Sequence, residues 1–83
     1  MRVEVKLPFL DENFEYCRIR RWLVKPGEVV EIDQDLAELE ADGKKIIFPS
    51  PVDGKVIELA VAPGILVATD EVLLVIEEGD IAV

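Results

Sequence analysis

The sequence of 83 residues contains no histidine and only one cysteine (Cys17), one serine (Ser50) and one threonine (Thr69). Without histidine, neither a serine–histidine–aspartate triad nor a cysteine–histidine pair can form, and a zinc site of cysteine and histidine ligands is excluded as well. A lone cysteine cannot form an intramolecular disulfide, so we expect Cys17 to be a small buried strand residue in a reducing compartment. The residue inventory predicts a protein that is not an enzyme and has no metal site.

Basic residues are scarce, since nine lysines and arginines face 18 acidic residues and give a net charge of −9. Such a chain repels a phosphate backbone, which argues against a nucleic-acid partner and favours basic surfaces on other proteins. Long apolar runs are absent too, so the sequence predicts neither a membrane span nor a signal peptide, and we expect a cytoplasmic protein. We interpret the one basic cluster, Arg18, Arg20 and Arg21, as solvated strand positions that balance nearby carboxylates.

An internal repeat organises what the sequence does contain. The stretch VKPGEVVEIDQDLAELE, residues 24–40, overlays VAPGILVATDEVLLVIE, residues 61–77, without gaps, and seven of its 17 positions are identical. A solenoid needs at least three units, whereas two units that span nearly the whole chain indicate two similar halves packed on each other. The repeat therefore predicts one domain over residues 1–83 with approximate two-fold symmetry.

Each half of the repeat has the composition of β-structure. Short runs rich in branched and aromatic residues alternate with turn signals such as the Pro-Gly pairs at residues 26–27 and 63–64. Residues 32–41 are the best candidate for a helix, but their repeat partner is strand-like, so we predict a strand. The expected fold is all-β, a flattened barrel or sandwich of two antiparallel sheets. Its predicted core contains Val5, Ile19, Val30, Leu36, Ile47, Val56, Val67, Leu73 and Val75.

The stretch LEADGKKIIFPSPVDG, residues 39–54, places Asp42-Gly43 between two strand-like runs. An Asp-Gly pair in this position is one of the strongest signals for a tight hairpin. Lys44 and Lys45 follow the turn directly. Under the two-fold symmetry, this hairpin tip and the chain ends should lie at opposite poles of the domain.

Together these motifs resemble the lipoyl domains of 2-oxo acid dehydrogenase acyltransferases, within the wider biotinyl/lipoyl attachment family. The resemblance rests on Val-Lys-Pro-Gly-Glu, Leu-x-x-Leu-Glu, an aspartate at a hairpin, Pro-Ser-Pro-x-x-Gly-x-Val and a second Pro-Gly turn, and it covers essentially the whole chain. It implies two four-stranded sheets and a carrier role. In the family a lysine at the hairpin tip receives lipoate or biotin and swings an acyl group or carboxylate between other proteins, while the domain makes no bonds itself.

The family's landmarks fall in ungapped register at Gly27, Glu40, Asp42 and Gly54, but Gly43 occupies the position of the family's lysine. Three hypotheses follow. The first is an unmodified lipoyl-type module that acts as a protein-interaction unit. The second is a true acyl carrier with lipoate on the displaced Lys44, served by a lipoate attachment enzyme and by 2-oxo acid dehydrogenase components. The third, a free-standing enzyme, is disfavoured because a small barrel filled by its own side chains leaves no cleft. A biotinyl carrier is less well supported, because Met1 is the only methionine.

One further segment is a candidate partner surface. In lipoyl domains, the loop that corresponds to residues 7–14 lies near the tip and helps a partner dehydrogenase recognise its carrier. Here that segment contains Phe9, Leu10 and Phe14 among acidic and amide residues. These apolar side chains either form a partner patch or fold back over one end of the barrel.

Overall fold

A computed structural model describes residues 1–7 and 16–79 of the chain. Every regular element in these two ranges is a strand, and none is a helix that could span a membrane. The eight strands are β1 (Arg2–Lys6), β2 (Tyr16–Trp22), β3 (Val29–Val30), β4 (Asp35–Ala41), β5 (Lys44–Pro49), β6 (Gly54–Leu59), β7 (Leu66–Ala68) and β8 (Val72–Glu78). The predicted strand over residues 32–41 is therefore confirmed as β4.

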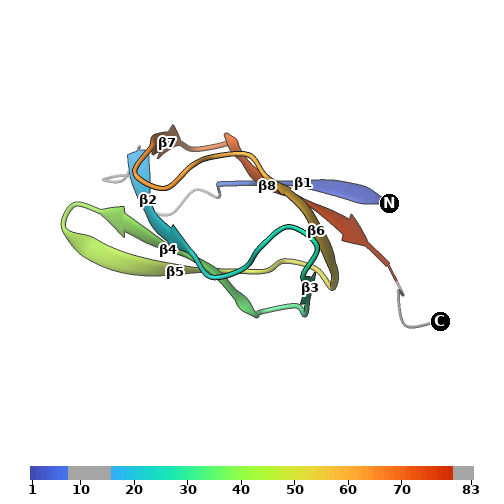
Figure 1. Ribbon diagram of the computed structural model, residues 1–83. Helices are drawn as coiled ribbons and strands as arrows, with labels where there is room; N and C mark the ends of the chain where they lie inside the picture. The colour runs from blue at the N-terminus through green and yellow to red at the C-terminus, as the bar shows by residue number, and fades with distance from the viewer. Residues whose placement is uncertain (8–15, 80–83) are drawn as a thin grey trace.

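The strands form two four-stranded antiparallel sheets that pack face to face (Figure 1). One sheet has the order β5-β4-β2-β7 and includes the hairpin at residues 42–43, so we name it the tip sheet. The other has the order β1-β8-β6-β3 and contains the first and last strands, so we name it the terminal sheet. This arrangement confirms the predicted all-β sandwich with two four-stranded sheets.

The two-fold repeat is visible in the backbone itself. Strands β4 and β8 have bounds that differ by 37 residues, which is the offset of the sequence overlay. The amide of Gly27 donates to the carbonyl of Val56 at 2.7 Å, and the amide of Gly64 donates to the carbonyl of Ile19 at the same distance. Each half also contributes strands to both sheets, so the halves are interleaved and neither forms a sheet alone.

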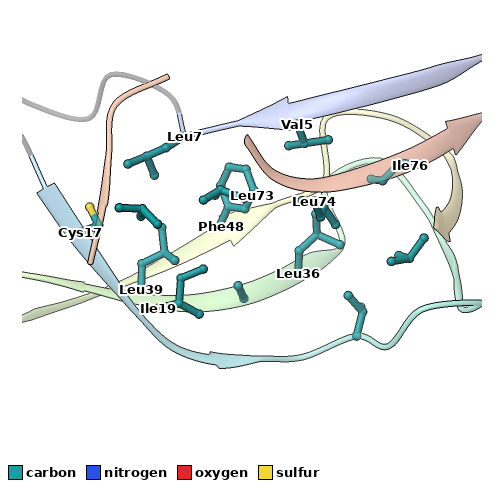
Figure 2. Close-up of a cluster of buried hydrophobic side chains, with 14 of the residues drawn as sticks. Val5, Leu7, Cys17, Ile19, Leu36, Leu39, Phe48, Leu73, Leu74 and Ile76 are labelled. Carbon is teal, nitrogen blue, oxygen red and sulfur yellow. The ribbon is translucent and has the colours of Figure 1, made fainter. Parts of the chain in front are cut away.

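The core lies between the two sheets (Figure 2). It is built from aliphatic residues with one aromatic ring, and Cys17 is fully buried within it, as predicted. The buried residues labelled in Figure 2 are Val5, Leu7, Cys17, Ile19, Leu36, Leu39, Phe48, Leu73, Leu74 and Ile76. Seven of the nine predicted core residues are buried.

The other two predicted core residues, Ile47 and Val75, were assigned to the wrong face. Ile47 is 38% exposed, because its register places it opposite Glu38 on the outer face of the tip sheet while the next residue, Phe48, turns inward. Val75 lies opposite Glu4 and Glu58 on the outer face of the terminal sheet. In a run of several apolar residues, a period of two does not by itself show which residues face the core.

The molecule is elongated and measures 43 × 20 × 18 Å. The hairpin tip lies at one pole, and the start of β1 lies beside the end of β8 at the other (Figure 1). At the pole remote from the tip, the amino group of Met1 donates to the carbonyl of Glu78 at 3.0 Å and forms an ion pair with Glu77. For the first residue and the end of β8, this arrangement agrees with the expectation drawn from the repeat; residues 80–83 lie outside the described residues. The tip therefore stands clear of the start of β1 and the end of β8.

Gly54 lies where the backbones of two strands approach each other closely. It begins β6 and lies opposite Glu78 of β8, and a Cβ atom added to it would come within 2.4 Å of the Glu77 carbonyl oxygen. A contact this short with backbone cannot be relieved by rotating a side chain. This packing explains why a glycine is needed at this landmark of the sequence.

The change Gly54→Ala should therefore destabilise the fold by about 3 kcal/mol, near the upper end of the range for overpacking. Gly27→Ala is the matched control, because a Cβ there meets no atom within 4 Å and the positive φ alone costs about 1 kcal/mol. Urea denaturation of both variants measures the difference. Equal losses would contradict the assignment of Gly54 to a close backbone contact.

Candidate functional site

The hairpin tip is a two-residue turn. Ala41 and Lys44 are directly paired as the last residue of β4 and the first of β5, which leaves only Asp42 and Gly43 at the apex. Their φ angles are +52° and +73°, the pattern of a type I′ turn that matches the twist of the flanking strands. Aspartate tolerates this left-handed region and glycine adopts it freely, so the sequence explains the turn locally.

Lys44 lies one position beyond the apex, already in the strand. Its Cα partner is Ala41, and paired residues of an antiparallel ladder project from the same face, which here is the inner face that carries Leu39 and Phe48. Lys44 itself is exposed, and within residues 1–7 and 16–79 it forms no ion pair. Its side chain is accessible, but it starts from the first residue of β5 and not from the apex of the turn.

Lys45 projects from the opposite face. Its ammonium lies 3.0 Å from Oε1 of Glu38, while Oε2 of the same carboxylate accepts a hydrogen bond from Nε of Arg21. Glu38 thus joins β2 and β5 across the outer face of the tip sheet. Only 9% of Glu38 is exposed, and both of its oxygens have cationic partners.

The neighbouring cations shift the pKa of Glu38. The hydrogen bond from Lys45 and then that from Arg21 hold the pKa of the Glu38 carboxyl below its usual value, outweighing the effect of burial. A group whose pKa is lowered on folding stabilises the fold above its unfolded pKa and loses that contribution as the pH falls. Glu38 is therefore an ionised structural hub, and a lowered pKa makes it a poor general acid or base near neutral pH.

The remaining residues of the predicted site lie around this hub. Glu40 is half-buried and faces Arg18 and Lys45 across the sheet, and Asp42 is exposed at the apex. The candidate partner residues Phe9, Leu10 and Phe14 lie outside the described residues. The hub residue Glu38 was not predicted as part of the site. The sequence does not show that Glu38 lies close to Arg21, because the pairing of β2 with β4 is not visible in it.

One groove departs from the expectation of a sandwich without a cleft. A shallow groove of about 450 Å³ lies between the edge strands β1 and β5, and most of its lining is apolar, including Val3, Ile46 and Phe48. Ser50 also lines it, but its hydroxyl donates to the carbonyl of Val52 at 2.6 Å, and the chain has no histidine to activate it. The groove offers apolar contact without an activated nucleophile.

Two further observations limit the chemistry of the described residues. Burial raises the pKa of the Cys17 thiol, which disfavours the reactive thiolate. Across residues 1–7 and 16–79, no three cysteine or acidic side chains come together in an arrangement that could hold a metal ion. The exposed features of the site are thus the turn, the two lysines beside it and the charged outer face of the tip sheet.

Comparison with known proteins identifies the family to which this symmetric sandwich with a tight hairpin at one pole belongs. Residues 3–76 match the family model Biotin_lipoyl, which is described as "Biotin-requiring enzyme". The chain belongs to this biotin/lipoyl family. Within it, the chain is a lipoyl-type domain related to those of the 2-oxo acid dehydrogenase acyltransferases.

Two curated relatives illustrate that relationship. The chain is 37% identical over 79 residues to the dihydrolipoyllysine-residue succinyltransferase component of the 2-oxoglutarate dehydrogenase complex of Bartonella vinsonii subsp. berkhoffii. It is 38% identical over 74 residues to the dihydrolipoyllysine-residue acetyltransferase component of the pyruvate dehydrogenase complex of Bacillus subtilis (strain 168). The matches cover 95% and 89% of this chain but only 19% and 17% of the relatives. The chain thus spans about a fifth of the length of these proteins.

A solved structure agrees with the fold. The solution structure of the lipoyl domain of the 2-oxoglutarate dehydrogenase complex from Azotobacter vinelandii superimposes with a TM-score of 0.70 at 28% sequence identity. The match covers 90% of this chain and 96% of that domain. The resemblance found in the sequence is therefore confirmed for family and fold.

The Glu38 hub leads to a prediction about pH. The stability difference between the wild-type protein and Glu38→Gln should be largest above pH 4.5, the usual pKa of a glutamate, and should shrink as the pH falls through and below it. Urea denaturation of both proteins over a pH series measures this difference. Glu31→Gln, at an exposed position, is the control for the loss of one negative charge. A difference that stays constant with pH would contradict the role given to Glu38.

Proposed function

We propose that this chain is a non-catalytic lipoyl-type module that lacks the standard acceptor lysine and acts through contacts with other proteins. The observation that carries the proposal is the occupancy of the apex by Asp42 and Gly43 alone. Gly43 stands where the lysine of the family stands in the ungapped register. The usual acceptor position therefore has no amine.

The placement of the two neighbouring lysines supports the proposal. Attachment enzymes of the family depend on where the lysine sits on the turn. Lys45 projects from the outer face and its ammonium is bound by Glu38, whereas Lys44 is displaced into the strand opposite Ala41. Neither lysine occupies the apex.

A second candidate function is that of an acyl carrier with lipoate on Lys44. The observation in its favour is that Lys44 is exposed beside the apex and forms no ion pair within the described part of the chain. A lipoyl arm on a rigid tip would raise the effective concentration of an acyl group at partner active sites. This function would require a lipoate attachment enzyme.

The relatives suggest the class of protein partner. Both curated relatives described above are components of 2-oxo acid dehydrogenase complexes, and the solved lipoyl domain comes from such a complex. We propose that the module contacts components of a complex of this kind. An interaction role needs only the folded surface, which is present whether or not the tip is modified.

Mass spectrometry after co-expression with a lipoate attachment enzyme and excess lipoate tests the proposal. The wild-type protein should keep its unmodified mass, whereas Gly43→Lys should gain one lipoyl group at residue 43. The new side chain has space, because a Cβ at Gly43 meets no atom within 4 Å, and the positive φ costs only about 1 kcal/mol. A lipoyl domain that is fully modified in parallel is the positive control.

Peptide mapping separates the two candidate functions. A lipoyl group on Lys44 of the wild-type protein, removed by Lys44→Ala and retained by Lys45→Ala, would replace the proposed function with the carrier function. If Gly43→Lys folds but stays unmodified, the position of the turn is not what blocks attachment. The register argument that carries the proposal would then fail.

A further inference from the structure

The outer face of the tip sheet combines basic side chains with exposed apolar and aromatic ones. Tyr16 and Arg18 alternate along β2 with the buried residues Cys17 and Ile19, so they project outward. Residues on the neighbouring strands join them on the same face through the ladder register. We name this surface the basic face and define it by Tyr16, Arg18, Arg20, Arg21, Lys45 and Leu66. The acidic residues Glu38 and Glu40 lie among them on the same face.

A register irregularity gives the basic face two consecutive arginines. The pairing of β2 with β4 shifts between Ile19 and Arg21, and both Arg20 and Arg21 are exposed. A regular strand would turn one of two adjacent side chains inward. The irregularity instead lets Arg21 reach Glu38 and keeps Arg20 at the surface.

The charge of this sheet is opposite to that of the whole chain. The strands of the tip sheet carry five basic and three acidic residues, whereas the strands of the terminal sheet carry three basic and four acidic ones. The chain as a whole has a net charge of −9. Its negative charge is therefore concentrated outside the tip sheet, and the tip sheet is locally positive.

A hollow in the basic face is suited to a carboxylate. Arg20, Arg21, Glu38 and Lys45 line a shallow hollow of about 370 Å³, so three cations share one acidic side chain. Glu38 accepts from Nε of Arg21, and among the described residues the terminal nitrogens of that guanidinium have no other acidic partner. A guanidinium has five N–H donors in a planar fork that matches a carboxylate. The hollow thus keeps unused donors and a positive excess.

Apolar side chains lie beside the charged ones. Tyr16 is 55% exposed on β2, and Leu66 is 52% exposed on β7 directly opposite Arg18. Nη1 of Arg18 donates to the carbonyl of Gly64 at 2.9 Å, which restrains that side chain in the unbound protein. Exposed tyrosine and arginine are the residues enriched at the centres of protein interfaces.

We propose that the basic face binds an acidic peptide segment of a partner protein, with a carboxylate in the hollow and an apolar side chain against Tyr16 and Leu66. The inference rests on the proposed role as an interaction module and names the surface and the partner chemistry. A short acidic segment matches the local positive charge. A long polyanion such as a nucleic acid would also meet the negative charge of the rest of the molecule, which disfavours it.

Two synthetic peptides test the proposal. One combines several carboxylates with leucines, and its twin carries the corresponding amides at every acidic position. Fluorescence polarisation measures their binding to the wild-type protein, and NMR chemical shifts locate the contact. The acidic peptide should bind about tenfold more tightly than its twin, and its affinity should fall as salt is added. Its binding should shift resonances of β2 and β5.

Matched charge reversals separate the basic face from net charge. Arg20→Glu should weaken binding of the acidic peptide about tenfold or more, because it replaces a cation of the hollow with an anion at a residue that is not a partner of Glu38. Arg2→Glu changes the net charge equally but acts on β1 of the terminal sheet, so it should leave binding nearly unchanged. Circular dichroism confirms that both variants fold. Equal weakening by the two reversals would overturn the proposal.

Other results would overturn it as well. Equal binding of the amide twin would show that the carboxylates do not contribute to the interaction. Tighter binding of a single-stranded oligonucleotide would show that the face binds a nucleic acid instead. A wild-type dimer in sedimentation that Arg20→Glu dissociates would make a second copy the occupant of the face. Absence of peptide binding in a protein with an unmodified tip would refute this inference alone, whereas lipoylation of the wild-type protein would refute the proposed function at the tip alone.

Discussion

The two-residue turn at Asp42 and Gly43 is the constraint on which the site depends. A turn of this length pairs Ala41 with Lys44 and Glu40 with Lys45, so it fixes the face from which each lysine projects. With that register, Lys45 reaches Glu38, and Glu38 in turn binds Arg21 of β2. If the turn also included Lys44, Lys45 would pair with Ala41 on the inner face and could no longer reach this hub.

The interleaved sheets give the tip a rigid base. Each half of the repeat supplies strands to both sheets, and Trp22 adds a hydrogen bond from its indole N–H to the carbonyl of Val61 in the other half. The shared core then holds the hairpin at the pole opposite the paired ends of β1 and β8 (Figure 1). A lipoyl-type domain uses such a base to present its tip. The same base also supports the basic face on the outer side of the tip sheet.

The sequence was sufficient to predict the family from the motifs it shares with lipoyl domains, and the turn from the local Asp-Gly signal. The internal repeat predicted the two-sheet fold and the placement of the tip opposite the start of β1. The sequence misplaced Ile47 and Val75, since a run of apolar residues does not set the phase of a strand. It also did not predict the hub of Glu38 with Arg21 and Lys45. That hub depends on a shift in register between β2 and β4, which arises from the packing of the two strands and leaves no local mark in the sequence.

The most direct test of the central claim is the register of the tip in solution, measured by NMR. Cross-strand nuclear Overhauser effects between Ala41 and Lys44, together with couplings that report positive φ at Asp42 and Gly43, would establish the two-residue turn. The structure predicts both observations. A wider loop with Lys44 at its apex and no Ala41–Lys44 contact would contradict the account and would return the acceptor role to that lysine.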